Sequence, residues 1–261
     1  MNKPFQLIRS IPATTEQQPA LSICKVSKIF PADNGYLNVL DNVSFDMTSG
    51  ELICLLGPSG CGKTTLLKLI AGFMTPSAGN IRIHNRTVSR PGPDRCVVFQ
   101  EDALFPWLTV SENIAFGAKG LMPKSRLVPE VHRHLEMVGL TAFKDYLPKE
   151  ISGGMKQRVA SARVLILQPQ LLLMDEPFGA LDAQTREDMQ NLLLSLWEKF
   201  SHTIVFVTHD LVEAITLADR ILVMGTNPGH IRSVIQVPLS RPRKKESNVF
   251  HSFFRDLRGR L

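Results

Sequence analysis

The fold is decided by the stretch Gly57-Pro58-Ser59-Gly60-Cys61-Gly62-Lys63-Thr64-Thr65. It follows the apolar run 52–56 and precedes the apolar-rich segment 66–70. A strand, a glycine-rich loop and a helix in this order are the context in which such a pattern forms a phosphate-binding loop. Its glycines permit backbone angles that turn successive N–H groups toward one point. We therefore predict that the chain binds a nucleoside triphosphate through all nine residues.

Two side chains at the end of this loop have separate expected tasks. Lys63 can reach the β- and γ-phosphates, and the Thr64 hydroxyl can hold Mg²⁺. The helix that starts near Lys63 adds the positive end of its dipole, which favours a bound anion.

The composition is that of a globular protein with a substantial core. The chain has 261 residues, of which 44% are hydrophobic, and no apolar run approaches the eighteen or so residues that cross a bilayer. No signal peptide is evident in the polar N-terminus. The four cysteines form no C-x-x-C pair, and we expect reduced thiols, with Cys61 exposed enough to react. These features predict a soluble, intracellular protein.

The hydrophobic pattern divides the chain into parts. Residues 1–20 are expected to form a flexible arm, and alternation over 21–30 and 39–47 predicts an antiparallel β layer. Short buried runs separated by helices then predict a parallel sheet covered on both faces. These runs are 52–56, 171–174, 203–207 and 221–224, with further strands at 81–83 and 96–99 and a helix at 183–200.

Helical spacing between 108 and 165, with loops at 117–129 and 141–154, predicts a helical insertion over about 102–165. The expected fold is α/β: a P-loop NTPase core with a mainly parallel sheet, an N-terminal antiparallel β layer and a helical subdomain. We assign the nucleotide-binding domain to 21–238 and a basic extension to 239–261.

The extension carries most of the chain's net charge. It has seven lysines and arginines against two acidic residues, and the whole chain has a net charge of +6. Such a segment can contact anionic lipid or nucleic acid. We favour a solvated extension, because Pro242 interrupts it and aromatic residues are not interleaved with the charges.

Asp175 and Glu176 follow a run of four apolar residues. At the carboxyl end of a buried strand, Asp175 is placed to organise Mg²⁺. A carboxylate beside the γ-phosphate, here Glu176, is the natural group to polarise an attacking water. The alternative is an acidic pair that ends a strand in a turn.

The segment Ser152-Gly153-Gly154 precedes a helix with apolar periodicity. Serine is a favoured N-cap residue, and the two glycines expose the backbone at a helix N-terminus, where anions bind. By itself this segment would be an ordinary helix cap.

Taken together, these motifs resemble the ATP-binding subunit of ABC transporters, from Leu21 to about Arg232. In chain order the matching segments are 57–64, Gln100, Ser152-Gly153-Gly154, Asp175-Glu176, Gly179-Ala180-Leu181-Asp182 and His209.

The resemblance implies a role for each segment. Gln100 touches Mg²⁺ or the attacking water, and 152–154 contacts the γ-phosphate of ATP held by a partner subunit. Asp182 lies at the dimer interface, and His209 hydrogen-bonds the γ-phosphate. Catalysis is thus assigned to Glu176, His209 and Gln100.

Two positions differ from the family's usual pattern. Phe30 stands where the family usually has an aromatic residue, commonly tyrosine, that stacks on adenine; Tyr36 is the second candidate. Met155 stands where the family's signature commonly ends in glutamine; this departure bears on any polar contact from that side chain and leaves the contacts of Ser152 and the backbone.

A subgroup of bacterial importers, for nitrate, bicarbonate, taurine and aliphatic sulfonates, is resembled by four segments: 91–100, 104–107, 152–158 and 227–231. The resemblance implies a head-to-tail ATPase dimer, homodimeric or with a related chain, on the cytoplasmic face of the cell membrane. It also implies two transmembrane permease subunits and, indirectly, an extracytoplasmic solute-binding protein. Trp107 is either a docking anchor for the permeases or a core tryptophan.

The competing class is a soluble ABC-type ATPase that acts on nucleic acid or ribosomes without a membrane partner. Such proteins typically carry a long coiled coil or two ATPase units. This chain has one phosphate loop and only about 110 residues between Lys63 and Asp175. We therefore expect no nucleic-acid partner.

Overall fold

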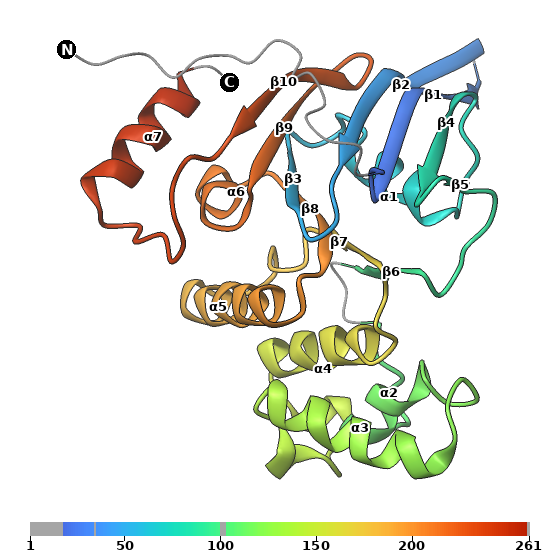
Figure 1. The fold of residues 1–261 in the computed structure, drawn as a ribbon, viewed down its shortest axis with the longest axis vertical. Helices are drawn as coiled ribbons and strands as arrows, with labels where there is room; N and C mark the ends of the chain where they lie inside the picture. The colour runs from blue at the N-terminus through green and yellow to red at the C-terminus, as the bar shows by residue number, and fades with distance from the viewer. Residues whose placement is uncertain (1–17, 34, 100–102, 260–261) are drawn as a thin grey trace. The chain divides into compact units, whose positions relative to one another are not determined.

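A computed structural model describes residues 18–33, 35–99 and 103–259, so Gln100 lies outside the described residues. The chain forms two compact units (Figure 1). The first unit combines Met1–Pro91 with Thr203–Leu261, and the second is Gly92–His202.

An antiparallel sheet occupies the N-terminal part of the first unit, as predicted. Its strand order is β2-β1-β4-β5, and every pairing in it is antiparallel. The strands are β1 (Leu21–Ala32), β2 (Gly35–Met47), β4 (Ala78–Ile83) and β5 (Arg86–Thr87).

Parallel strands form the centre of the same unit. The central strand β3 (Leu52–Leu56) runs parallel to β8 (Thr203–Thr208) on one side and to β9 (Arg220–Gly225) on the other. The antiparallel β10 (His230–Gln236) pairs with β9. All five residues of β3 and all six of β8 are buried, as expected for strands covered on both faces. The helices of this unit are α1 (Lys63–Ala71), α6 (Leu211–Leu217) and α7 (Asn248–Arg258).

The second unit contains the parallel pair β6 (Arg95–Val98) and β7 (Leu171–Asp175). Its helices are α2 (Val110–Phe116), α3 (Lys124–Met137), α4 (Gly153–Leu165) and α5 (Ala183–Phe200), with short 3₁₀ turns at Thr141–Phe143 and Pro148–Glu150. Helices α2, α3 and α4 lie together (Figure 1) around a shared apolar core. The predicted α/β fold with parallel strands, an antiparallel layer and a group of helices is confirmed.

The predicted helix 183–200 is confirmed residue for residue, but the predicted loop over 117–129 is wrong in its second half. Helix α3 begins at Lys124 and carries Pro129 inside it. A proline costs one backbone hydrogen bond there, and burial of Val131 and Leu135 in the helical core compensates for that loss.

The C-terminal extension is not solvated throughout. Helix α7, which the sequence analysis did not predict, buries Phe250, Phe253 and Leu257 and packs against α6. Its N-cap is Ser247, whose hydroxyl accepts a hydrogen bond from Phe250 N at 3.2 Å. Across the described parts of the chain, no helix is both long enough and apolar enough to span a bilayer.

The loop before α2 is held by one buried amide. Asn113 is fully buried, and its Oδ1 accepts from Phe105 N at 2.9 Å. Its Nδ2 donates to the carbonyl oxygens of Phe105, Leu108 and Thr109 at 3.2, 2.9 and 3.0 Å. A buried polar group with all its partners satisfied fixes the chain around it.

We predict that Asn113→Ala destabilises the second unit by about 2–4 kcal/mol, because it leaves backbone groups buried without their partner. Urea unfolding measures this change. Asn191, exposed on α5, is the matched control, and its alanine variant should change stability by less than about 0.5 kcal/mol. Equal shifts for the two variants would contradict the structural role of Asn113.

Candidate nucleotide site

The phosphate loop runs directly from β3 into α1. Gly60 and Gly62 have φ of 81° and 91°, in the left-handed region that side chains disfavour. At Gly62 a Cβ would also lie 2.6 Å from Cδ2 of the buried Leu40. Gly62 is the N-cap of α1, so the loop ends at the positive end of a helix dipole. The predicted strand, loop and helix are confirmed.

Lys63 lies folded over its own loop. Its side chain is only 5% exposed, and Nζ donates to the carbonyl oxygens of Gly57 at 2.7 Å and Pro58 at 3.0 Å. The neighbouring Ser59, Gly60 and Thr64 are exposed. The loop therefore combines a positively charged ammonium with an accessible hydroxyl, the groups that a phosphate and its cation require.

The prediction that Cys61 is exposed enough to react is wrong. Its side chain is fully buried, and a Cβ at Gly57 would lie 2.8 Å from Cys61 Sγ. The loop winds around the thiol, so the side chain points into the protein while the backbone contributes to the loop.

A residue that the sequence analysis did not assign to the site supports the loop from behind. Gly229 N donates to Val39 O at 2.9 Å, and Gly229 O accepts from Asp41 N at 2.9 Å. A Cβ at Gly229 would lie only 2.2 Å from Cys61 O. The only sequence signal was the resemblance of segment 227–231 to an importer subgroup, because nothing in the spacing of Gly229 links it to the loop.

His209 lies at the strand end next to the loop. In the parallel pair β3–β8, Leu56 is level with Thr208, so Gly57 and His209 follow neighbouring strands at the same edge. His209 is exposed, and the turn after it is fixed by the side chain of Asp210. This carboxylate accepts from Val212 N at 2.7 Å and from Glu213 N at 3.2 Å.

In the second unit, Asp175 ends β7 and is 9% exposed. Glu176 follows with φ of 45°. This left-handed conformation costs an ordinary side chain about 1–2 kcal/mol, and such strain is concentrated at functional sites. The strand end thus presents a half-buried carboxylate in a fixed, unfavourable backbone conformation.

The signature segment and Asp182 lie side by side in this unit. Ser152 caps α4, and its hydroxyl accepts from Met155 N at 3.3 Å. A Cβ at Gly154 would lie 2.3 Å from Cγ2 of Thr185, whereas at Gly153 it would meet nothing within 4 Å. Asp182 caps α5 by accepting from Thr185 N at 3.0 Å, and this hydrogen bond lowers the pKa of Asp182.

Met155, which replaces the family's usual glutamine, packs half-buried against the helical core formed by α2, α3 and α4. An apolar side chain suits that position. Met155 lies in the first turn of α4, after the N-cap Ser152.

The adenine platform stays a prediction. Phe30 is half-buried in β1 with Lys28 Nζ 5.0 Å from its ring centroid, and Tyr36 is 84% exposed.

The candidate metal ligands supply oxygen atoms, as Mg²⁺ prefers. Thr64 is exposed at the start of α1, and Asp175 stands at a strand end. Among the described residues, no group of three or more His, Cys, Asp or Glu could hold a metal ion by protein ligands alone. A single oxygen donor of either kind suits Mg²⁺, which usually keeps waters and phosphate oxygens in its shell.

Comparison with known proteins shows the family of the chain. The family model described as ABC transporter matches residues 40–179. The chain is 43% identical over 253 residues to the bicarbonate transport ATP-binding protein CmpD of Synechococcus elongatus, covering 95% of this chain and 91% of CmpD. It is 48% identical over 231 residues to the aliphatic sulfonates import ATP-binding protein SsuB of Bacillus thuringiensis, covering 88% of this chain and 91% of SsuB.

Among solved structures, the dimeric post-hydrolysis state of the ATP-binding cassette MJ0796, bound to ADP and Pi, superimposes with a TM-score of 0.73. The two chains are 30% identical, and the match covers 84% of this chain and 100% of the cassette. Sequence, fold and phosphate loop agree: this chain belongs to the ABC transporter family, as one of its ATP-binding subunits.

Proposed function

We propose that this chain is the ATP-hydrolysing motor of an importer for a small anionic solute, of the class that includes bicarbonate and sulfonates. The observation that carries the proposal is the phosphate loop, in which two left-handed glycines and the buried Lys63 lead into a helix N-terminus. The solute class is supported by the names of the relatives CmpD and SsuB.

In this proposal the loop residues bind and orient the triphosphate. The Lys63 ammonium exchanges its two carbonyl acceptors for phosphate oxygens, and the helix dipole adds to the attraction. Thr64 and Asp175 would hold Mg²⁺, which, when bound, neutralises charge on the β- and γ-phosphates.

Glu176 is the proposed general base, which accepts a proton from the attacking water. His209 donates a hydrogen bond to the γ-phosphate, and Gln100 orients the water or the metal. The place of Glu176 directly after the strand that ends at Asp175, in a left-handed backbone conformation, supports its assignment as the base.

The proposed assembly is a head-to-tail dimer, in which the signature 152–154 and Asp182 of one subunit face the ATP of the other. The dimeric cassette MJ0796 supports a dimer. Two permease subunits and, indirectly, a solute-binding protein complete the proposed importer. In this proposal the chain lies at the cytoplasmic face of the membrane.

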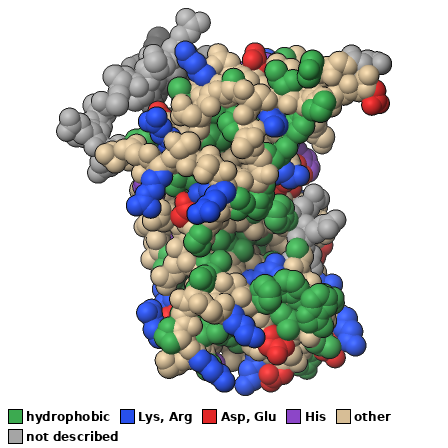
Figure 2. Space-filling model, turned by 90° about the vertical axis from the view of Figure 1, so that its right-hand side faces the viewer, with side chains coloured by type: hydrophobic (Ala, Val, Ile, Leu, Met, Phe, Trp, Pro, Cys, Tyr) green, Lys and Arg blue, Asp and Glu red, His purple; other side chains and the backbone are tan. Residues whose placement is uncertain are grey.

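The proposed permease contact is an aromatic surface of the second unit, defined by Phe105, Trp107 and Phe116. Trp107 is 71% exposed and Phe116 is 49% exposed, so the alternative of a core tryptophan is wrong. The ring centroid of Phe105 lies 5.6 Å from that of Trp107 and 4.3 Å from that of Phe116. Figure 2 shows hydrophobic side chains gathered at the level of α2 and α3. Exposed aromatic clusters are typical of interfaces.

ATP hydrolysis by the full chain, with and without detergent-solubilised membrane proteins that copurify with it, tests the proposal. Stimulation by these partners is the expected outcome. Stimulation by nucleic acid instead would favour the soluble class of ABC-type ATPase.

We predict that Lys63→Ala weakens ATP binding about 10- to 100-fold, because it removes charge-assisted hydrogen bonds to phosphate. Titration with a fluorescent ATP analogue measures the dissociation constant. Lys68→Ala, later in the same helix, is the control and should bind ATP as the unmodified chain does. Unchanged affinity in Lys63→Ala would exclude the phosphate-loop assignment.

We predict that Glu176→Gln lowers the turnover number about 10²- to 10⁴-fold, the usual contribution of a general base, and leaves ATP affinity within about twofold. Phosphate release and nucleotide titration measure the two quantities. The control Glu198→Gln changes an exposed carboxylate on α5 and should keep full turnover. Wild-type turnover in Glu176→Gln would disprove the general-base role.

We predict that Trp107→Ala weakens binding to the permease subunits about 30-fold, as for an aromatic residue at the centre of an interface. Basal ATP hydrolysis of the isolated chain should not change. Binding to permeases in detergent or nanodiscs measures the effect. Val249→Ala, which truncates a 62%-exposed side chain on α7, serves as the control; equal losses in the two variants would refute the docking role.

A further inference from the structure

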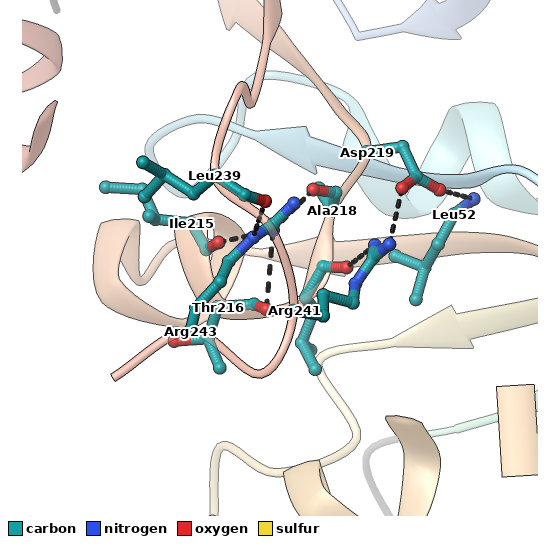
Figure 3. Close-up of polar contacts among 9 residues, drawn as sticks. Leu52, Ile215, Thr216, Ala218, Asp219, Leu239, Arg241 and Arg243 are labelled. Atoms are coloured by element: carbon teal, nitrogen blue, oxygen red, sulfur yellow. Dashed lines mark hydrogen bonds and ion pairs between the residues drawn. The ribbon is translucent and has the colours of Figure 1, made fainter. Parts of the chain in front are cut away.

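Two arginines of the C-terminal extension turn inward. The Arg241 side chain is only 11% exposed, and Arg243 is half-buried. Both reach the end of α6, the short helix that follows His209 (Figure 3). Neither contact is expected of a solvated basic tail.

Arg243 binds the last carbonyl groups of α6. Its Nη1 donates to Ile215 O and Ala218 O, both at 2.6 Å, and to Thr216 O at 3.4 Å, while Nε donates to Leu239 O at 2.9 Å. Carbonyls at a helix end lack partners within the helix, and a cation there complements the dipole. Burial lowers the pKa of Arg243 to about 10, so the guanidinium remains charged at neutral pH.

Arg241 connects the same helix end to the strand of the phosphate loop. Its Nη1 forms an ion pair with Asp219 Oδ1 at 2.6 Å, and Nη2 donates to Leu217 O. The other carboxylate oxygen of Asp219 accepts from Leu52 N at 2.9 Å, and Asp219 N donates to Leu52 O at 2.8 Å. Leu52 begins β3, the strand that leads into Gly57.

The opposite end of α6 is the turn that carries His209. Thr208 Oγ1 donates to the buried Glu213 Oε2 at 2.5 Å and accepts from Asp210 N at 3.0 Å. Helix α6 has only seven residues, and an isolated helix of this length is not stable in water. Its position therefore depends on its contacts with the rest of the unit, which are the packing of its buried residues and the hydrogen bonds at its two ends.

We propose that Arg241 and Arg243 are positioning residues for His209: the C-terminal segment holds α6 so that His209 stays at the γ-phosphate position. Helix α7 follows these arginines in the same C-terminal segment, and it also packs against α6. The inference rests on the proposed role of His209 in hydrolysis. It predicts an effect on turnover and not on nucleotide affinity, because the phosphate loop is left intact.

The test compares Arg243→Ala, His209→Ala and the double variant in the full chain. We expect Arg243→Ala to lower kcat about 10- to 100-fold, as for a catalytic group that is displaced by about 1 Å. The KM for ATP and the dissociation constant of a fluorescent ATP analogue should stay within about twofold. The double variant should hydrolyse ATP as slowly as His209→Ala alone, since coupled residues are not additive.

Two further variants separate positioning from folding. Arg243→Lys keeps the cation but loses the planar fork, so it should recover part of kcat and have a Tm close to that of the unmodified chain. Arg258→Ala removes a cation from the exposed last turn of α7 and should keep full kcat.

Full kcat in a folded Arg243→Ala, or effects of Arg243→Ala and His209→Ala that multiply in the double variant, would overturn the inference. A kcat of Arg243→Lys no higher than that of Arg243→Ala would also overturn it. Full kcat in His209→Ala would instead overturn the proposed role of His209, and this outcome is distinguishable because it does not involve Arg243.

Discussion

The backbone of the phosphate loop is confined between β2 and the turn before β10, and there is no room for a side chain at Gly62 or Gly229. A Cβ at Gly62 would meet Leu40, and one at Gly229 would meet the carbonyl of Cys61. Close packing of this kind is rigid. The loop is therefore held in shape before any nucleotide arrives, which lowers the entropic cost of ordering it around a phosphate.

Four segments of the candidate site share one structural feature: each leads into a helix N-terminus. Helix α1 is capped by Gly62, α4 by Ser152, α5 by Asp182 and α6 by Asp210. Strands β3 and β8 lead into the first and the last of these points, and the side-chain caps of Ser152, Asp182 and Asp210 fix the first turn of their helices. An anion at such a position meets backbone donors whose direction is set by the fold, so few charged side chains are required.

The hydrophobic pattern of the sequence predicted the secondary structure that depends on neighbouring residues. The helix 183–200, the antiparallel layer and the buried strand before Asp175 were all evident from periodicity. The patterns failed where distant segments meet. Gly229 supports the loop across a gap in sequence of more than 160 residues, and Arg243 acts on a helix that ends 26 positions earlier. Cys61 was assigned to the surface because loop residues usually lie there, whereas the glycines around it let the chain fold over the thiol.

The buried thiol of Cys61 has a consequence for how motion in this protein can be observed. Only a thiolate in contact with solvent reacts with an alkylating reagent, so Cys61 becomes reactive only during an opening of the loop that surrounds it. Its rate of modification therefore reports the frequency of that opening, as amide exchange does for a local unfolding event. The thiol of Cys61 can therefore serve as a chemical probe of the phosphate loop. A bound nucleotide that keeps the loop closed would slow alkylation of Cys61 without contacting its sulfur.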